Sequence, residues 1–257
     1  MPADDDRLAA ELAEEAGQRL QLLRSHGGDP DDLRKAGDAS SHRFLSAQIA
    51  ARRPGDAILS EEGSDDAARL AADRVWIVDP LDGTREFGEP GRTDWAVHVA
   101  LWEQGELTAG AVALPARGQV LSTADPPDQH EPQRTADTSR RQLRIVVSRS
   151  RPPAFAVRVA ERLGATLVPL GSAGAKAATV ILGGADAYLH DGGQYEWDSA
   201  APVAVALAAG LHASRVDGSK LEYNRASPWQ PDILICPGKL ADRLLAVIGA
   251  VRRTGTQ

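Results

Sequence analysis

The sequence predicts a mixed α and β protein, with an α+β first half and a layered α/β second half. In the first half, segments with helical periodicity precede two apolar runs that a glycine turn joins as a hairpin. After residue 142, strand and helix patterns alternate, which is typical of a layered sheet. Between the halves, residues 123–141 are polar and carry no periodicity, as at a domain boundary or in a mobile lid. We therefore expect two units, residues 1–135 and 140–257.

In the first half, two helices are expected to precede the strands. Apolar residues such as Leu8, Leu12 and Leu20 recur at helical spacing over residues 8–23. A second helix is expected over residues 38–50, because Pro54-Gly55 would stop it. The remaining expected elements are a short helix over 65–73 and strands over 57–59, 75–78, 95–102, 107–114 and 120–121.

In the second half, short apolar runs alternate with longer segments of helical pattern. The helix that begins at residue 198 is the most apolar of the chain. The expected strands cover 143–147, 166–168, 185–190, 213–216 and 233–236, and the expected helices cover 153–163, 172–182, 198–209 and 240–251.

The composition is that of a globular protein and argues against several classes of function. The net charge of -7 does not suit a general nucleic-acid binder, which needs a phosphate-neutralising surface. No stretch approaches the roughly 20 apolar residues of a membrane helix, and the first residues, MPADDD, do not resemble a secretory signal. The single cysteine, Cys236, allows no internal disulfide and no cysteine-based zinc cluster, so a reducing cytoplasm is the expected compartment.

Acidic residues follow two of the predicted strands. Glu61 comes shortly after the strand over 57–59; Asp79 directly follows the strand over 75–78, and Asp82 lies three residues later. Open α/β sheets bind ligands at the carboxyl ends of their strands. A carboxylate beside a buried strand also needs a partner or a metal ion. These acids therefore indicate a ligand site, although a solvated loop stays an alternative for Glu61.

Two further motifs lie where helices are expected to begin. The turn Asp82-Gly83-Thr84 brings the backbone close to a ligand, and free N–H groups at the start of a helix attract phosphate. A plain turn is the alternative there. Asp198 lies at the start of the apolar helix, so it is either an N-cap or, if it faces the other acids, a metal ligand.

Other types of site find little support. Residues 171–176, GSAGAK, lack the Walker spacing, and a turn of small residues for close packing is the alternative reading. The six histidines are scattered without the spacing of zinc ligands. There is no GxSxG elbow, and Cys236 is expected to be inert core because it lies in an apolar strand.

In combination, the motifs resemble the signature of the inositol monophosphatase superfamily, which comprises magnesium-dependent, lithium-sensitive phosphomonoesterases. They are EE at 61–62, DPLDGT at 79–84 and WDSAA at 197–201, in that order. The sequence DPLDGTREF over 79–87 is similar to that of the CysQ type, the 3′(2′),5′-bisphosphate nucleotidases. The stretches 110–118 and 171–187 resemble those of actinobacterial members of this type. The resemblance covers residue 38 to the last strand. It implies an α-β-α-β-α sandwich of the sugar phosphatase type, with the active site between the halves.

The resemblance also implies roles for individual residues. Asp38 and Thr84 match the pair that orients and deprotonates the attacking water. The implied substrate-binding residues are Gly83, Thr84, Arg85, Ser172, Lys176 and, as a looser match, Asp191. The implied magnesium ligands are Glu61, which is also counted as catalytic, Asp79, the Leu81 carbonyl, Asp82 and Asp198.

The chemistry of these residues agrees with that implication. Magnesium takes oxygen ligands and keeps several waters. Packed carboxylates raise one another's pKa values unless cations offset their charge, so two or three Mg²⁺ ions are expected. One ion lowers the pKa of the nucleophilic water, and another stabilises the leaving ester oxygen.

The sequence leaves three functions open. The first is removal of the 3′-phosphate of adenosine 3′,5′-bisphosphate, the by-product of sulfate activation or sulfonation. The second is the same chemistry on inositol monophosphate or fructose 1,6-bisphosphate, and the third is a non-catalytic, metal-dependent sugar or nucleotide binder. Arg85 and Lys176 discriminate among the substrates, because their charges could serve a second phosphate; Lys176 is expected to reach across the cleft. The expected partner is a small phosphorylated substrate, with no nucleic acid and no membrane, and a homodimer is left open.

Overall fold

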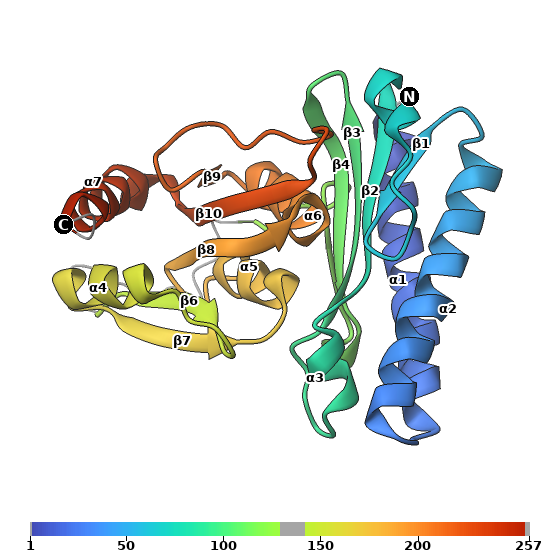
Figure 1. Ribbon diagram of the computed structural model, residues 1–257, viewed down its shortest axis with the longest axis horizontal. Coiled ribbons are helices and arrows are strands. Elements are labelled where there is room, and N and C mark those ends of the chain that lie inside the picture. Colours follow the sequence, from blue (N-terminus) through green and yellow to red (C-terminus); the bar gives the residue numbers. More distant parts are fainter. Residues whose placement is uncertain (1, 129–141, 255–257) are drawn as a thin grey trace.

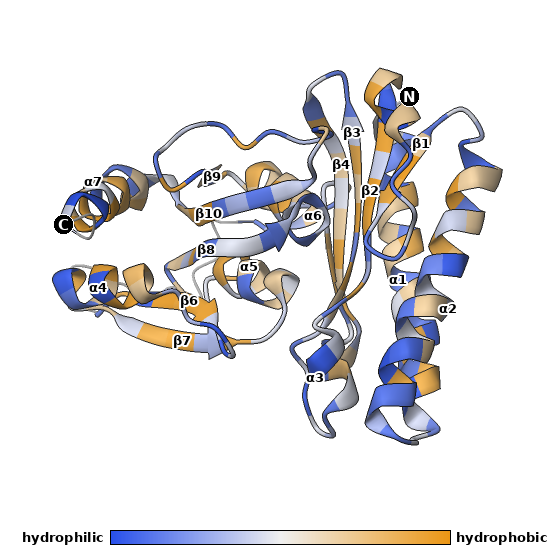
Figure 2. Cartoon of the chain, viewed as in Figure 1, coloured by the Kyte–Doolittle hydropathy of each residue, from blue (hydrophilic) through white to orange (hydrophobic). Residues whose placement is uncertain are grey.

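Helices and sheets alternate in an α-β-α-β-α stack in the computed structural model, which describes residues 2–128 and 142–254 (Figure 1). Two five-stranded sheets form the β layers. Hydrophobic residues lie along the helix faces that pack between or against the sheets (Figure 2). The layered fold expected from the sequence is therefore confirmed. No helix among the described residues is long and apolar enough to span a membrane.

The first sheet is formed by the first half of the chain, in the strand order β1-β2-β3-β4-β5. Strand β1 is parallel to β2, and the other neighbours are antiparallel. The strands are β1 (Ala57–Ser60), β2 (Arg74–Asp82), β3 (Ala96–Glu103), β4 (Glu106–Leu114) and β5 (Gln119–Ser122). The short helices are η1 (Ala67–Ala71), α3 (Thr84–Gly88) and η2 (Pro115–Arg117).

The outer face of this sheet is covered by α1 (Pro2–Ser25) and α2 (Pro30–Arg52). Helix α2 begins well before the expected residue 38. The reason is local: the Asp29 side chain accepts hydrogen bonds from the backbone of Asp31 and Asp32, and Pro30 occupies the first turn. Asp38 therefore lies inside a helix, on a rigid element that packs against β2.

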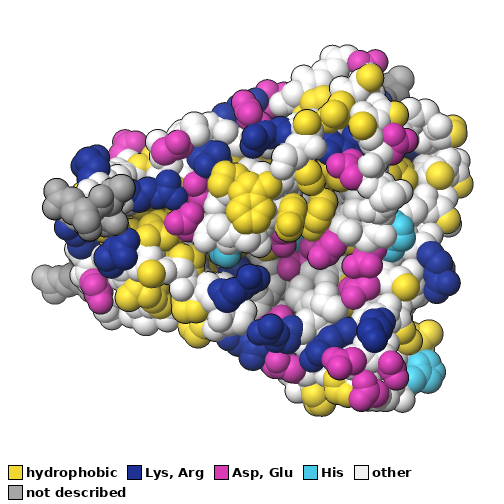
Figure 3. Space-filling model, in the orientation of Figure 1, with side chains coloured by type: hydrophobic (Ala, Val, Ile, Leu, Met, Phe, Trp, Pro, Cys, Tyr) yellow, Lys and Arg dark blue, Asp and Glu magenta, His cyan; other side chains and the backbone are white. Residues whose placement is uncertain are grey.

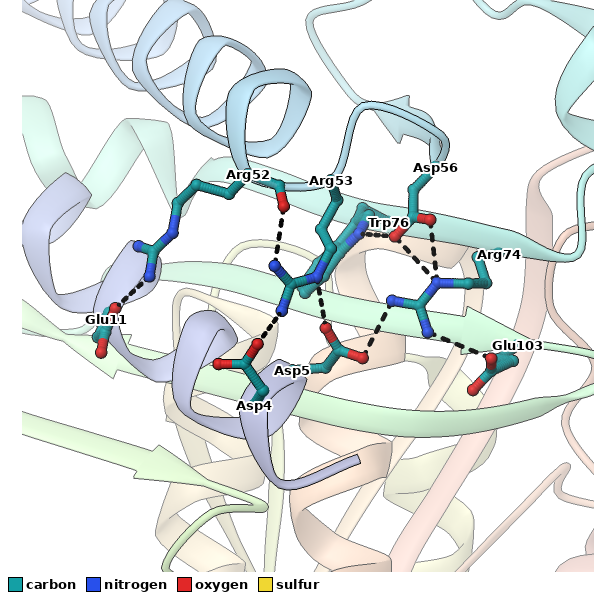
Figure 4. Close-up of polar contacts among 9 residues, drawn as sticks. All are labelled: Asp4, Asp5, Glu11, Arg52, Arg53, Asp56, Arg74, Trp76 and Glu103. Carbon is teal, nitrogen blue, oxygen red and sulfur yellow. Dashed lines mark hydrogen bonds and ion pairs between the residues drawn. The ribbon is translucent and has the colours of Figure 1, made fainter. Parts of the chain in front are cut away.

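An ionic network holds the two outer helices against the sheet (Figure 4). Its centre is Asp5, 5% exposed, whose carboxylate accepts from Arg53 at 2.7 Å and from Arg74 of β2 at 3.0 Å. Asp56 binds Arg74 and the indole N–H of Trp76. Because these contacts join residues distant in sequence, they fix the position of α2, and with it Asp38, relative to β2. The outer pairs of the network are Arg53–Asp4, Arg52–Glu11 and Arg74–Glu103.

The second sheet has the order β7-β6-β8-β10-β9. Strand β6 is parallel to β7 and β8, while β10 is antiparallel to both β8 and β9. Its strands are β6 (Arg144–Ser148), β7 (Thr166–Leu170), β8 (Ala187–Tyr195), β9 (Leu211–Ser214) and β10 (Trp229–Pro237). The helices are α4 (Ala154–Leu163), α5 (Ala173–Ile181), α6 (Glu196–Ala208) and α7 (Gly238–Thr254).

Helices α5 and α6 fill the layer between the two sheets, while α4 and α7 pack on the far side of the second sheet (Figure 1). One core cluster contains residues of both halves, including Val75, Val112, Ala178 and Ala201. Gly110 of β4 allows α6 to approach the first sheet closely, since a Cβ there would lie 2.6 Å from that of Ala204. The two halves thus share a core between the first sheet and helices α5 and α6. Most of the segment 123–141, expected as a boundary or lid, lies outside the described residues.

Candidate active site

Three carboxylates meet where β2 ends and α6 begins. Each of Asp79, Asp82 and Asp198 offers an oxygen atom, and these atoms lie within 4.8 Å of one another. The sequence predicts that this strand ends at residue 78, before Asp79, but β2 continues through Asp82. The pairing of β2 with β3 shifts register between Asp79 and Asp82, so Pro80 is accommodated at an irregularity that needs no ladder N–H. Asp198 lies in the first turn of α6, and its carboxylate accepts from the Tyr195 N–H at 2.7 Å.

The other predicted ligands and the water-activating pair border this cluster. The carboxyl of Glu61, just after β1, is in hydrogen-bonding contact with that of Asp79. Thr84 donates to the Leu81 carbonyl at 3.0 Å and lies 3.3 Å from the Asp38 carboxylate. Residues from α2, β1, β2, α3 and α6 are thereby brought together. Figure 3 shows acidic side chains around a hollow on this face of the molecule.

Most of these carboxyls have raised pKa values. Burial and the charge of Asp82 raise the pKa of Asp198 to about 6, and burial with neighbouring acids raises that of Glu61 to about 7. Burial, followed by the charges of Glu61, Asp82 and Asp198, also raises the pKa of Asp79 well above its usual value. Such a cluster attracts cations, because a bound cation relieves both the repulsion and the burial of charge. The all-oxygen donor set fits a hard divalent ion such as Mg²⁺.

Asp82 is the exception within the cluster. Its carboxylate accepts from the Ser172 hydroxyl at 2.6 Å and from the Ala173 and Gly174 N–H groups at 3.1 and 2.7 Å. Although burial alone raises the pKa of Asp82, His98, Lys176 and these hydrogen bonds lower it below its usual value. Asp82 is therefore ionised and held by the start of α5. Ser172, expected to bind substrate, is 1% exposed and positions this carboxylate.

His98 of β3 is a site residue that the sequence analysis missed. It is fully buried, with Nε2 3.1 Å from the Asp82 carboxylate and Nδ1 3.0 Å from the Trp197 carbonyl. Both neighbours are acceptors, an arrangement that favours a ring protonated on both nitrogens. Burial lowers the pKa of His98, but the charge and contact of Asp82, with the Trp197 carbonyl, together outweigh burial, so the pKa is raised overall. Gly174 makes room for this ring, since a Cβ there would lie 2.2 Å from Nε2. The available signal was a histidine within an apolar strand.

Lys176 does not reach across the cleft as expected. It is 3% exposed, and its ammonium donates to the Gly171 carbonyl at 2.6 Å and lies 5.4 Å from the centre of the Tyr188 ring. Burial lowers the pKa of Lys176, and its charge in turn lowers the pKa values of Asp82 and Asp198. The lysine faces inward because α5 packs between the two sheets, so the first turn of this helix is buried on all sides. Lys176 and His98 therefore supply positive charge beneath the acidic cluster.

Three other predicted substrate residues occupy different surroundings. Gly83 adopts the left-handed conformation, φ 84°, directly before α3, and a side chain there would approach Ser172 and Asp94. Arg85 is exposed on α3. Asp191 has a different neighbour: its carboxylate lies 3.3 Å from Arg252 of α7, which packs on the outer side of the second sheet.

A buried histidine on β8 leads to a pH-dependent stability. His190 is 8% exposed, its Nε2 donates to the Gly192 carbonyl at 2.7 Å, and burial lowers its pKa to about 4. In the unfolded chain the pKa of a histidine is about 6.5. Between that pH and about pH 4, His190 is therefore protonated in the unfolded chain but neutral in the folded one, so stability falls as the pH falls. We expect the free energy of unfolding, measured with urea, to fall by about 2.5 kcal/mol more in the wild type than in His190→Gln between about pH 7.5 and about pH 4.5. An equal fall in both proteins would contradict this assignment.

The chain matches known proteins over nearly its whole length. A model of the inositol monophosphatase family matches residues 5–252. A 3′-phosphoadenosine 5′-phosphate phosphatase of Mycobacterium tuberculosis is 53% identical over 242 residues, covering 91% of this chain and 89% of that protein. The inositol-1-monophosphatase SuhB of the same species is 33% identical over 268 residues, covering 90% of each chain.

The fold has counterparts among solved structures. CysQ from Bacteroides thetaiotaomicron superposes with a TM-score of 0.75 at 24% identity, covering 91% of this chain and 97% of that chain. At this identity the similarity concerns the fold alone. The family assignment rests on the match over residues 5–252 and on relatives at 33% and 53% identity, and it agrees with the acidic cluster at β2 and α6. The chain therefore belongs to the inositol monophosphatase family.

Proposed function

We propose that the protein is a magnesium-dependent phosphatase that removes the 3′-phosphate of adenosine 3′,5′-bisphosphate, giving AMP and phosphate. The choice of substrate rests on the 53% identity to a 3′-phosphoadenosine 5′-phosphate phosphatase over 91% of the chain. The acidic cluster and the Thr84–Asp38 pair support the reaction type. In the cytoplasm, such an activity would recycle a by-product of sulfate activation or sulfonation.

In this proposal, the carboxylates and one carbonyl hold two or three Mg²⁺ ions. Magnesium bound there would supply a nucleophilic water at neutral pH and would stabilise charge on the leaving oxygen. The proposed ligands are Glu61, Asp79, the Leu81 carbonyl, Asp82 and Asp198. His98 and Lys176 offset part of the negative charge of Asp82 and Asp198 but are not themselves in the positions of the ions.

The chain's own residues would handle the water and the phosphate. Thr84 and Asp38 orient the attacking water, and Asp38 accepts its proton. Burial and the charge of Glu62 raise the pKa of Asp38 to about 6, which suits a general base near neutral pH. The water oxygen would attack phosphorus while the bond between phosphorus and the ester oxygen breaks, and the leaving oxygen would take up a proton from solvent water. The N–H groups of Gly83 and Thr84 hold the phosphate oxygens.

Metal dependence gives a direct test of the ligand set. Removing divalent ions with EDTA is expected to abolish phosphate release, and Mg²⁺ is expected to restore it, because the repelling carboxylates need a hard cation. Zn²⁺ alone should not restore activity, and Li⁺ should inhibit. Phosphate release is measured after each addition. Full activity in EDTA, or rescue by Zn²⁺ alone, would refute the assignment.

The substrate is tested by comparing kcat/KM on adenosine 3′,5′-bisphosphate, inositol 1-phosphate and fructose 1,6-bisphosphate under the same Mg²⁺ concentration. We expect the nucleotide to be preferred. The alternative, an inositol phosphatase with the same mechanism, is supported by the 33% identity to an inositol-1-monophosphatase. A higher kcat/KM on inositol 1-phosphate would favour that alternative.

A further inference from the structure

Three aromatic side chains gather beside the acidic cluster, at the end of β8 and the start of β10. Tyr195 stacks on Trp197, with ring centres 4.8 Å apart and planes 10° from parallel. Trp229 meets Tyr195 at 5.6 Å in an edge-on arrangement, and the two residues are cross-strand partners. We propose that Tyr195 and Trp229 form the surface on which the purine ring of the nucleotide substrate stacks, an inference that rests on the proposed function.

The exposure of these rings is unusual for the protein. Tyr195 and Trp229 are each 40% exposed, and they are the aromatic residues among the exposed large hydrophobic side chains of residues 2–128 and 142–254. Aromatic residues make up only 4% of the chain, so their gathering at one place is not a consequence of abundance. Exposing apolar rings forgoes the free energy of burial unless a ligand covers them.

The backbone ties the aromatic surface to the candidate active site. The backbone N–H of Tyr195 donates to the Asp198 carboxylate at 2.7 Å, so the tyrosine is attached directly to a member of the acidic cluster. The backbone of Glu196, the next residue, donates to the Pro228 carbonyl at 2.7 Å, which ties Trp229 to the same turn. Figure 3 shows hydrophobic side chains on one border of the hollow and Lys and Arg side chains on the opposite border.

The two borders match the two remaining parts of a bisphosphorylated nucleoside. With the 3′-phosphate at the acidic cluster, the base and the 5′-phosphate leave the ribose at different carbon atoms. A purine suits the aromatic border, because every base presents a π face, and base stacking contributes about 1–3 kcal/mol. Trp197 covers one face of the Tyr195 ring and holds it in place, so stacking on the remaining surface requires little loss of side-chain freedom.

The test combines a protein variant with a substrate that lacks the base. Tyr195→Ala and Tyr195→Phe are compared with the wild type on adenosine 3′,5′-bisphosphate and on 1-deoxyribofuranose 3,5-bisphosphate, in which hydrogen replaces the base. Leu207→Ala is the matched control, because Leu207 is 51% exposed on the far part of α6. We expect Tyr195→Ala to lower kcat/KM on the nucleotide by about 5- to 150-fold and to leave the base-free ester nearly unchanged. Tyr195→Phe and Leu207→Ala should retain the wild-type values on both.

Binding gives a second measurement that does not depend on turnover. The Kd of AMP, measured by calorimetry with Mg²⁺ present, should rise by a similar factor in Tyr195→Ala and in Trp229→Ala. Equal losses of kcat/KM on both esters would overturn the inference, since Tyr195 would then act only through Asp198. The inference would also be overturned if Tyr195→Ala differed from the wild type in molecular mass in solution but showed no loss of kcat/KM specific to the nucleotide. The rings would then cover a second copy of the chain. If the wild type prefers inositol 1-phosphate, the proposed function itself fails; if the wild type prefers the nucleotide but Tyr195→Ala keeps its kcat/KM, only the stacking inference fails.

Discussion

Replacing Asp198 by Asn is expected to lower kcat on every phosphate ester by at least about 100-fold, since changes to the outer partners of metal sites alone give losses of about 10- to 100-fold. The amide oxygen of Asn can still accept from the Tyr195 N–H, so the start of α6 keeps its hydrogen bond. The variant loses a negative charge from a cluster whose members repel one another. Its melting temperature without Mg²⁺ should therefore be equal to or above that of the wild type, while the rise that Mg²⁺ induces should largely disappear.

The matched control is Asp242→Asn, which makes the same chemical change at an exposed position of α7. It should keep the wild-type kcat and the wild-type response of the melting temperature to Mg²⁺. Near wild-type turnover by Asp198→Asn at saturating Mg²⁺ would show that this carboxylate is not a ligand. Asp82→Asn should be equally inactive but less easily interpreted, because its new NH₂ group would face the donors of Ser172 and Gly174.

Replacing Lys176 by Met is expected to impair the protein on all substrates alike. Removing one partner of a buried group of charges typically destabilises by about 3–5 kcal/mol, because the remaining charges lose their compensation. Lys176 is buried and interacts with Asp82 and Asp198, so the effect on the free energy of unfolding should approach that range in metal-free protein. The substitution keeps a side chain of similar length, so lost packing contributes little. Urea denaturation and kcat/KM on adenosine 3′,5′-bisphosphate and inositol 1-phosphate are the measurements.

Lys220→Met is the matched control, since Lys220 pairs with Glu106 on the surface, where an ion pair contributes about 0–1 kcal/mol. It should change neither stability nor activity appreciably. A loss for Lys176→Met that is confined to the bisphosphorylated nucleotide would contradict the structural role. Such a result would instead restore the expectation, drawn from the sequence, that this lysine serves a second phosphate.

Local sequence patterns predicted most of the elements, because amphipathic periodicity depends only on which face of an element is buried. The hairpin of β3 and β4 and the alternation of β6 to α7 were found this way. Several boundaries were wrong, and two of them have local reasons that periodicity does not register. Asp29 and Pro30 begin α2 earlier than its apolar pattern does, and the irregular pairing after Asp79 lets β2 continue past Pro80.

By itself, the sequence determined the layered fold and the acidic residues that would make a metal site. It did so because Asp79, Asp82 and Asp198 lie in short motifs whose order along the chain is specific. Only the tertiary structure decided what surrounds these acids. The packing of α5 between the two sheets turns Lys176 inward, and the pairing of β3 with β2 places His98 against Asp82. Burial and charge compensation depend on elements distant in sequence, so no local pattern could have distinguished these two buried cations from a surface lysine and a scattered histidine.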